Sequence, residues 1–339
     1  MKKSILFSAL LFITIFSVHA QNDSTKTFSV TKSTTFTTYV DGYYRADFAG
    51  LKDNNKTSFT NSSNAFQLGM ASFKVDKTNG KFAATLDLGF GKRADEFSYN
   101  DKGLATAVKQ GYISFAPNST IKFTVGKWAT HIGYELLDAY LNRNYSMSYG
   151  FSYGPFFHTG VRADISLGGK SAMMIGVAEP TDFINAKVEP KMIIAQFSTA
   201  TSDDKLKAYL NYQGGKDKTQ IDIVLNTVIT SEFGFSYDGT VCSLAGTNWS
   251  SNAVYFNYDL SPKFGLAVRS EYFNDSESAL GLGTSVFQNT LSANLKFNKF
   301  TIIPEIRFDD ATNTPFLTKA QAATGTAGSF LIAAVYKFN

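Results

Sequence analysis

The chain has 339 residues, of which 44% are hydrophobic and 15% aromatic, yet its mean hydropathy is only −0.11. Its net charge of +4, from 32 Lys and Arg against 28 Asp and Glu, argues against nucleic acid as a partner, because such proteins usually carry a clustered basic face. The single Cys242 excludes an intramolecular disulfide and a cysteine-based metal site.

Residues 1–20 have the pattern of a cleaved signal peptide. Lys2 and Lys3 precede an apolar stretch over 5–16, and Val18-His19-Ala20 fits a cleavage site. The apolar stretch is short for a membrane helix, which needs about 20 residues. We therefore expect a mature chain that begins at Gln21, with a short N-terminal lead over 21–33 and a single domain over 34–339.

The segment 34–48 is the first predicted strand. Phe36, Val40, Tyr44 and Phe48 fall on one face, while charged residues such as Asp41 fall on the other, and this period of two predicts a strand. The segment is long enough to cross a tilted membrane wall. Similar alternation recurs in segments around 82–90, 121–125, 157–167, 206–213, 264–272, 300–309 and 330–338, and less clearly around 64–76, 171–180 and 250–260.

The connections between these segments alternate in length. Short turns are predicted near 77–80, 117–120, 168–170, 201–204, 230–231, 261–263 and 298–299 from their Gly, Asn, Asp and Pro residues. Longer polar connections are predicted near 49–63, 91–103, 128–154, 179–190, 244–249, 275–283 and 310–327. Short periplasmic turns and longer outer loops are typical of outer-membrane barrels.

The pattern as a whole predicts an all-β fold, a transmembrane antiparallel up-and-down β-barrel of about 16 strands in the outer membrane of a Gram-negative cell. Many aromatic residues with a polar average suit an apolar outer band, aromatic girdles and a wet interior. The alternative is a soluble periplasmic β-sandwich or β-helix. The signal peptide, the strand lengths and the C-terminal strand favour the barrel.

The middle of the chain resembles the OmpL-like β-barrel porin family of Gram-negative outer membranes. The resemblance is carried by Gly126-Lys127-Trp128-Ala129-Thr130-His131-Ile132-Gly133-Tyr134-Glu135, by Asn144-Tyr145-Ser146 and by the segment 151–162. Segments 39–44, 87–91, 109–114 and 304–309 support it. The resemblance implies a porin-like channel for passive diffusion of small hydrophilic solutes or ions, without naming the solute.

The resemblance also implies a role for the connection 128–154. In trimeric porins the loop at this place folds into the lumen and narrows the pore, and charged groups at such a constriction set ion preference. The predicted constriction residues are Lys127, His131, Glu135, Asp138 and Arg143. The alternative is an ordinary extracellular loop.

Charged side chains on the polar face of the strands are expected to line the lumen, because a Lys or Arg facing lipid near the midplane costs roughly 2–4 kcal/mol. The predicted lining residues are Asp41, Arg45, Asp47, Asp87, Lys122, His158, Arg162, Asp164, Arg269, Glu271, Glu305, Arg307 and Asp309. Cross-strand ion pairing that supports the wall is an equally open role for them.

Other functions are disfavoured. His131 and His158 lie near Ser146 and Ser152 in sequence, but the chain has no G-x-S-x-G motif and no third metal ligand beside the histidines. A TonB-dependent importer needs a plug domain and a larger barrel. A structural barrel or adhesin remains the main rival to a channel.

We expect no cofactor and no catalysis. The predicted partners are outer-membrane lipid, small hydrophilic solutes and the barrel assembly machinery. The last strand, 331–339, resembles the signal that this machinery reads. Here Phe338 is followed by Asn339 rather than ending the chain. A homotrimer follows from the analogy with porins alone.

Overall fold

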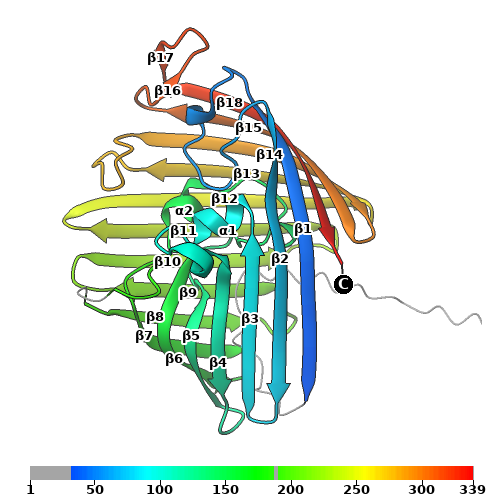
Figure 1. The fold of residues 1–339 in the computed structure, drawn as a ribbon, viewed down its shortest axis with the longest axis vertical. Coiled ribbons are helices and arrows are strands. Elements are labelled where there is room, and N and C mark those ends of the chain that lie inside the picture. The colour runs from blue at the N-terminus through cyan, green and yellow to red at the C-terminus, as the bar shows by residue number, and fades with distance from the viewer. Residues whose placement is uncertain (1–31, 187–189, 339) are drawn as a thin grey trace, which may run out of the picture.

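The computed structural model describes residues 32–186 and 190–338, and most of them form one closed β-barrel (Figure 1). Sixteen strands close the barrel, which confirms the predicted count. They are β1 (Ser33–Asp47), β2 (Ala65–Asn79), β3 (Phe82–Phe90), β4 (Val108–Phe115), β5 (Ile121–Ala129), β6 (Phe157–Gly168), β7 (Ser171–Ala178), β8 (Met192–Ala200), β9 (Leu206–Gly214), β10 (Lys218–Val228), β11 (Phe233–Leu244), β12 (Thr247–Ser261), β13 (Phe264–Asn274), β14 (Ser285–Phe297), β15 (Phe300–Ala311) and β18 (Thr326–Lys337).

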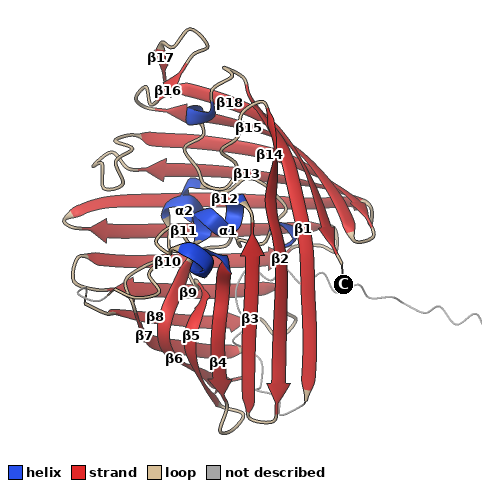
Figure 2. Ribbon diagram, viewed as in Figure 1, coloured by secondary structure: helices blue, strands red, loops and turns tan. Residues whose placement is uncertain are grey.

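Each barrel strand pairs antiparallel with its neighbours in chain order, and β1 closes the sheet against β18. Tyr39 is opposite Lys337 and Asp47 is opposite Ser329 in this closing pair. Closure leaves no open edge in the barrel sheet, so the strand backbones are paired around the whole ring (Figure 2). A small hairpin, β16 (Phe316–Leu317) with β17 (Ala323–Thr324), lies in the connection from β15 to β18.

The two faces of the wall differ as the alternation predicts. On β14, Phe287, Leu291 and Phe297 are exposed, whereas Gln288 and Thr290 are almost completely buried. Exposed apolar residues and buried polar residues together mean that the apolar face points outward and the polar face points into the barrel. The three segments whose faces were hardest to separate in the sequence also form strands, as β2, β7 and β12.

The connections at one end of the barrel are short, as predicted, but those at the other end are not all long. The predicted long connection 244–249 is wrong: β11 and β12 extend up to a two-residue turn at Ala245 and Gly246, both with positive φ. A second tight connection at 215–217, between β9 and β10, was not predicted. Polar residues near strand ends look like loop residues in a sequence, although here they continue the sheet pairing.

The long loops from the opposite end carry the helices and fold into the barrel. They hold α1 (Lys92–Phe97), α2 (Tyr149–Tyr153) and the short 3-10 helices η1 (Lys52–Asn54), η2 (Gly103–Ala107) and η3 (Ala139–Leu141). Figure 1 shows α1 and α2 in the middle of the barrel rather than beyond its rim. Within the described residues, none of the helices has the length and apolar character needed to cross a membrane.

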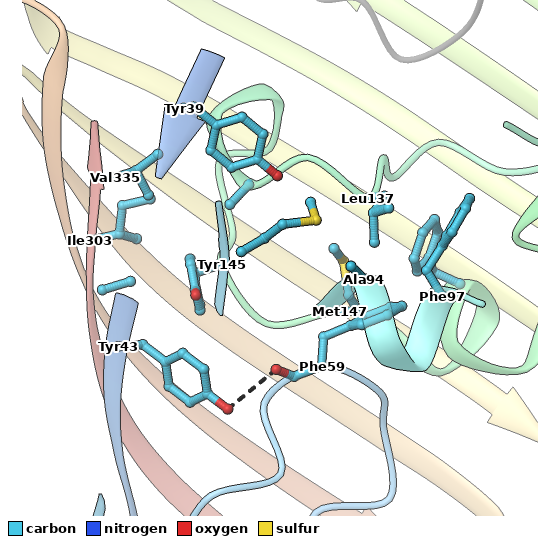
Figure 3. Close-up of a cluster of buried hydrophobic side chains, with 14 of the residues drawn as sticks. Tyr39, Tyr43, Phe59, Ala94, Phe97, Leu137, Tyr145, Met147, Ile303 and Val335 are labelled. Carbon is cyan, nitrogen blue, oxygen red and sulfur yellow. Dashed lines mark hydrogen bonds between the residues drawn. The ribbon is translucent and has the colours of Figure 1, made fainter. Parts of the chain in front are cut away.

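A buried apolar cluster joins these loops to the wall near the closing strands. Tyr145 and Met147 from the 130–156 loop lie beside Tyr43 of β1, Phe59 of the β1–β2 loop and Phe97 of α1 (Figure 3). The Tyr43 hydroxyl donates a hydrogen bond to the Phe59 carbonyl at 3.2 Å. The predicted signal peptide, 1–20, lies outside the described residues, as does the predicted lead, 21–33, except for its last two residues. Ser33 already belongs to β1.

Replacing Leu291 by Arg tests the outward face directly. Leu291 lies opposite Val268 of β13 and Ile306 of β15 on the apolar surface. We expect Leu291→Arg to lower the free energy of unfolding by about 2–4 kcal/mol in vesicles, because a guanidinium near the bilayer midplane is poorly solvated. Phe297→Arg, at the end of the strand beside a short turn, should cost about 0–1 kcal/mol. Equal losses in denaturant titrations would contradict this orientation.

Candidate functional site

The connection from β5 to β6 runs through the barrel interior as one long loop, residues 130–156. It contains η3 and α2, and α2 begins after Ser148, whose hydroxyl accepts a hydrogen bond from the Phe151 N–H at 3.0 Å. Because much of this loop is buried, its backbone N–H groups need acceptors from the loop itself or from the wall. The wall supplies these partners mainly as carboxylates.

Glu271 of β13 and Glu305 of β15 hold the middle of the 130–156 loop by its backbone. Glu271 accepts hydrogen bonds from the N–H groups of Tyr149 at 2.8 Å and Gly150 at 2.6 Å. Glu305 accepts from the N–H groups of Tyr145 at 2.8 Å and Ser146 at 3.2 Å. Hydrogen bonds to a carboxylate are roughly twice as strong as neutral ones, which suits anchors with this role.

Arg269 of β13 binds the loop from the same wall with the opposite charge. Its guanidinium is fully buried and donates to Glu135 at 2.6 Å and to the Ser146 carbonyl at 2.7 Å. Glu135 also accepts from the Ser148 N–H at 2.8 Å. Arg307 of β15 repeats the arrangement, donating to the Met147 carbonyl at 2.8 Å.

On the opposite side of the loop, β10 and β11 hold its first residues. Asp222 of β10 accepts from the Gly133 N–H at 3.1 Å, and Asp238 of β11 accepts from the Tyr134 N–H at 2.8 Å. The 130–156 loop is thus bound both to β10–β11 and to β13–β15, and it crosses the interior between them.

Two further loops also enter the interior and contact the 130–156 loop. Arg93 of α1 is fully buried and donates to the carbonyls of Tyr145 at 2.7 Å and Leu137 at 3.3 Å. From the β1–β2 loop, the Ser58 N–H donates to the Ser152 hydroxyl at 3.0 Å, and the Thr57 hydroxyl accepts from Arg307 at 3.1 Å. Only the 130–156 loop was predicted to enter the barrel.

Asp182, in the β7–β8 connection, fixes the end of the loop where β6 begins. It accepts hydrogen bonds from the N–H groups of Phe156 at 2.7 Å and Phe157 at 2.9 Å. Burial raises the pKa of Asp182 to about 6, although these N–H donors and the Tyr99 hydroxyl act in the opposite direction. Its identity could not be read from the sequence, because it lies in a loop without alternation.

The structure brings four of the five predicted constriction residues into the 130–156 loop. Glu135 pairs with Arg269, Asp138 with Lys109 of β4 at 2.6 Å, and Arg143 with Asp259 of β12 through two hydrogen bonds of 2.7 and 2.6 Å. His131 is bonded to the Tyr212 carbonyl at 3.0 Å.

Lys127 does not belong to this loop. It lies on β5, which extends to Ala129, and its ammonium group pairs with Asp101 of the β3–β4 connection at 2.9 Å. The sequence prediction ended the strand too early, because Gly126 and the polar Lys127 interrupt its apolar alternation.

The predicted lining residues lie on the interior face of the wall, and most of them are covered by the loops. Arg45 pairs with Asp47, Arg162 with Asp164, and Arg307 with Asp309 at 2.8 Å. Lys122 stays about one-third exposed beside Asp164. The residues that are buried at 7% exposure or less are Asp41, Arg45, Asp47, Asp87, His158, Arg162, Asp164, Arg269, Glu271, Glu305, Arg307 and Asp309.

Sequence reasoning missed Asp222, Asp238 and Arg93. Asp222 had a usable signal, since Gln220, Asp222 and Asn226 alternate with the apolar residues 221, 223 and 225. Arg93 had none, because it lies on a six-residue helix in a polar connection.

The histidines are placed as a structural pair. The rings of His131 and His158 lie 5.0 Å apart, and His158 is bonded to the Thr130 hydroxyl. Ser152 donates to the Ser148 carbonyl, and Ser146 lies against Arg269. The described part of the chain has no group of three or more His, Cys, Asp or Glu residues arranged to hold a metal.

Removing Arg269 tests the anchoring of the loop. Arg269→Met should lower the free energy of unfolding by about 3–5 kcal/mol, because it leaves Glu135 buried without its partner. The double variant Arg269→Met with Glu135→Gln should lose less, since no unpaired charge remains. Lys170→Ala, which breaks the exposed pair with Asp204, serves as the control and should cost about 0.5 kcal/mol or less. If Arg269→Met behaves like that control, the anchor is not structural.

Lowering the pH should destabilise the folded protein through protonation of His131. Burial lowers the pKa of His131 to about 4, with Arg162 acting in the same direction, whereas an unfolded histidine titrates near 6.5. The unfolded chain therefore binds the proton first, and stability falls as the pH drops from about 6.5 to 4. We expect His131→Gln to remove about 3 kcal/mol or less of this acid destabilisation, measured as unfolding free energy at pH 7 and pH 4. Parallel pH profiles for both proteins would refute the assignment.

Comparison with solved structures finds similar folds in outer-membrane proteins. OmpT of Vibrio cholerae lacking loop L8 shares 13% identity at a TM-score of 0.61, over 91% of this chain and 99% of that chain. The outer membrane channel DcaP of Acinetobacter baumannii shares 10% identity at a TM-score of 0.61, over 92% of this chain and 99% of that chain. An anion-selective porin from Comamonas acidovorans shares 12% identity at a TM-score of 0.58, over 91% of this chain and 100% of that chain. At these identities the likeness shows the fold alone.

A sequence search of curated proteins finds no match. The family model described as "beta-barrel porin-2, OmpL-like" matches residues 33–338, which is nearly the whole described barrel. The structure, a closed β-barrel with an apolar outer face, agrees with that description. The chain therefore belongs to the OmpL-like β-barrel porins of the outer membrane.

Proposed function

We propose that the protein is a channel for passive diffusion of small hydrophilic solutes or ions, with the 130–156 loop as its constriction. The observation that carries this proposal is the crossing of the interior by that loop, held on one side by Asp222 and Asp238 and on the other by Glu271 and Glu305. Anchors on both sides keep a constriction at a fixed width.

The distribution of exposed interior charges supports a passage that is wide at one end and narrow at its centre. Arg143, Asp259 and Lys296 are partly exposed where β12 and β14 approach their short turns. Lys74 with Asp76, and Lys122, are also partly exposed near that end. Charges at the centre are buried instead, so solutes that enter from the short-turn end meet the anchored loop.

The proposed transport needs no cofactor and no catalytic step. Affinity for the solute would be weak, because a channel must release what it admits. We also propose that β18, whose outward face alternates aromatic and other apolar residues with the interior face, is read by the barrel assembly machinery. Signal-peptide cleavage is proposed to precede assembly. A homotrimer is proposed from the porin fold alone.

Arg143 offers the sharpest test of the role of the loop, because it lies on the side of the loop that solutes entering from the short-turn end would meet. It is partly exposed, and its loss should not unfold the barrel. In planar bilayers we expect the wild-type protein to conduct. Arg143→Ala should raise single-channel conductance and shift selectivity toward cations, since it removes a bulky positive group from the loop and leaves Asp259 with Lys296. Lys170→Ala, in a short turn outside the barrel, removes the same charge and should change neither quantity.

The outcomes separate the two candidate functions. Unchanged conductance and selectivity in Arg143→Ala would remove the constriction role of this residue. A correctly folded wild-type barrel without any conductance would favour the alternative, a structural barrel or an adhesin that acts through its outer loops.

A further inference from the structure

The interior between the 130–156 loop and the short turns, here called the vestibule, exposes more cations than carboxylates. Among the described residues, six basic side chains on this part of the interior are partly exposed: Lys74, Lys122, Arg143, Lys207, Lys296 and Lys337. The partly exposed carboxylates beside them are Asp76, Asp138 and Asp259. The vestibule thus carries an excess of positive charge within reach of solutes.

Part of this excess comes from Asp259 of β12, which serves two cations. Its two oxygens accept from the Arg143 guanidinium at 2.7 and 2.6 Å, and one of them also accepts from the Lys296 ammonium at 2.7 Å. One carboxylate neutralises one cation, so this trio keeps one positive charge. All three side chains are partly exposed to the interior.

Asp164 of β6 is shared in the same way on another part of the wall. A single oxygen of Asp164 faces both the Lys122 ammonium at 3.3 Å and the Nε of Arg162 at 3.6 Å. This trio also keeps one positive charge. Five strands, β7 to β11, separate it from the β12–β14 trio in one direction around the ring, and six strands separate them in the other. The two trios therefore lie on opposite sides of the vestibule.

Two further lysines face the vestibule without a carboxylate of their own. Lys207 of β9 is opposite Asn226 of β10 on the interior face, and Lys337 of β18 is opposite the buried Tyr39 of β1. Within the part of the chain that the structure describes, neither lysine forms an ion pair with Asp or Glu. Lys337 lies over the Tyr140 ring instead, 5.0 Å from its centre. The excess charge is thus spread around the ring.

Carboxylates deeper in the interior do not cancel this excess. Glu271 and Glu305 are buried and accept backbone N–H groups of the loop, whose dipoles offset their charge. Asp222 and Asp238 are hydrogen-bonded to each other, and such a bond between two carboxyl groups needs a proton on one of them. Solutes in the vestibule therefore meet mainly the exposed cations.

We propose that the vestibule makes the channel prefer small anions to small cations. The inference rests on the proposed channel function and names the class of ion that the channel favours. An excess of one sign of charge on the walls of a narrow aqueous space concentrates counter-ions and repels ions of the same sign. The preference is moderate, because Asp76, Asp138 and Asp259 offset part of the positive charge.

The test is the reversal potential of single channels under a KCl gradient. We expect the wild type to pass Cl⁻ more readily than K⁺. Lys122→Gln with Lys207→Gln should lower the ratio of Cl⁻ to K⁺ permeability by about twofold or more, because it removes two of the excess charges. Arg162 stays beside Asp164 in this variant, so that carboxylate keeps a cation.

The matched control is Lys170→Gln with Lys205→Gln, two exposed lysines in short turns outside the barrel. It changes the net charge by the same amount and should leave the permeability ratio unchanged, because salt screens charges outside the lumen over about 10 Å.

A variant of opposite sign guards against an effect of misfolding. Asp76 is partly exposed and pairs with Lys74 at 3.3 Å. Asp76→Asn adds a positive charge to the vestibule and should raise the permeability ratio, whereas damage to the wall would not move the ratio in opposite directions in the two variants. Folding of each variant is checked by its heat-dependent mobility in gels.

The outcomes distinguish this inference from the proposed function. A conducting wild type that prefers K⁺ would overturn the anion preference and leave the channel function intact. An unchanged permeability ratio in Lys122→Gln with Lys207→Gln would do the same. A folded wild type that conducts no ions would overturn the channel function itself, and the anion preference with it.

Discussion

The structure depends on how the interior of the barrel satisfies the backbone of the 130–156 loop. Buried N–H groups need acceptors, and a loop has few of its own. Glu271 and Glu305 supply acceptors from one side of the wall, and Asp222 and Asp238 supply them from the other. Because the anchors bind the backbone, they fix the path of the loop while leaving its side chains free to differ.

This anchoring changes the role of the charged interior face. A wide barrel would leave such side chains in water, where they would interact weakly. Here three loops cover them, so Arg269 and Arg307 become fully or nearly fully buried and bind carbonyl groups as well as carboxylates. The same residues that would line an open pore therefore anchor the 130–156 loop in place.

Burial of charge also decides where the interior can act on ions. Compensated groups such as Arg307 with Asp309 are structural, since their fields largely cancel. The function of a porin depends on the groups that remain uncompensated or exposed, because a narrow passage concentrates their field. Arg143, which stays partly exposed near the short turns, is such a group.

The sequence determined the wall. Alternation places the apolar residues of a strand such as 34–48 on one face. Because lipid lies on one side of the wall and a polar interior on the other, only one orientation of that strand is stable. The barrel, its strand number and the inward direction of residues such as Asp41 and Glu305 follow from this local rule. Prediction failed at 244–249 and at Lys127, where polar residues near strand ends hide the continuation of the sheet.

Tertiary structure alone decided what fills the barrel. Entry of the 91–107 loop through Arg93, the contact of Glu135 with Arg269 across 134 positions in sequence, and the meeting of Asp222 with Asp238 all depend on strands that closure brings around one space. Alternation says which way a side chain points, but it is a local pattern with no information on what lies across the lumen. Those partners are set by the three-dimensional path of the loops.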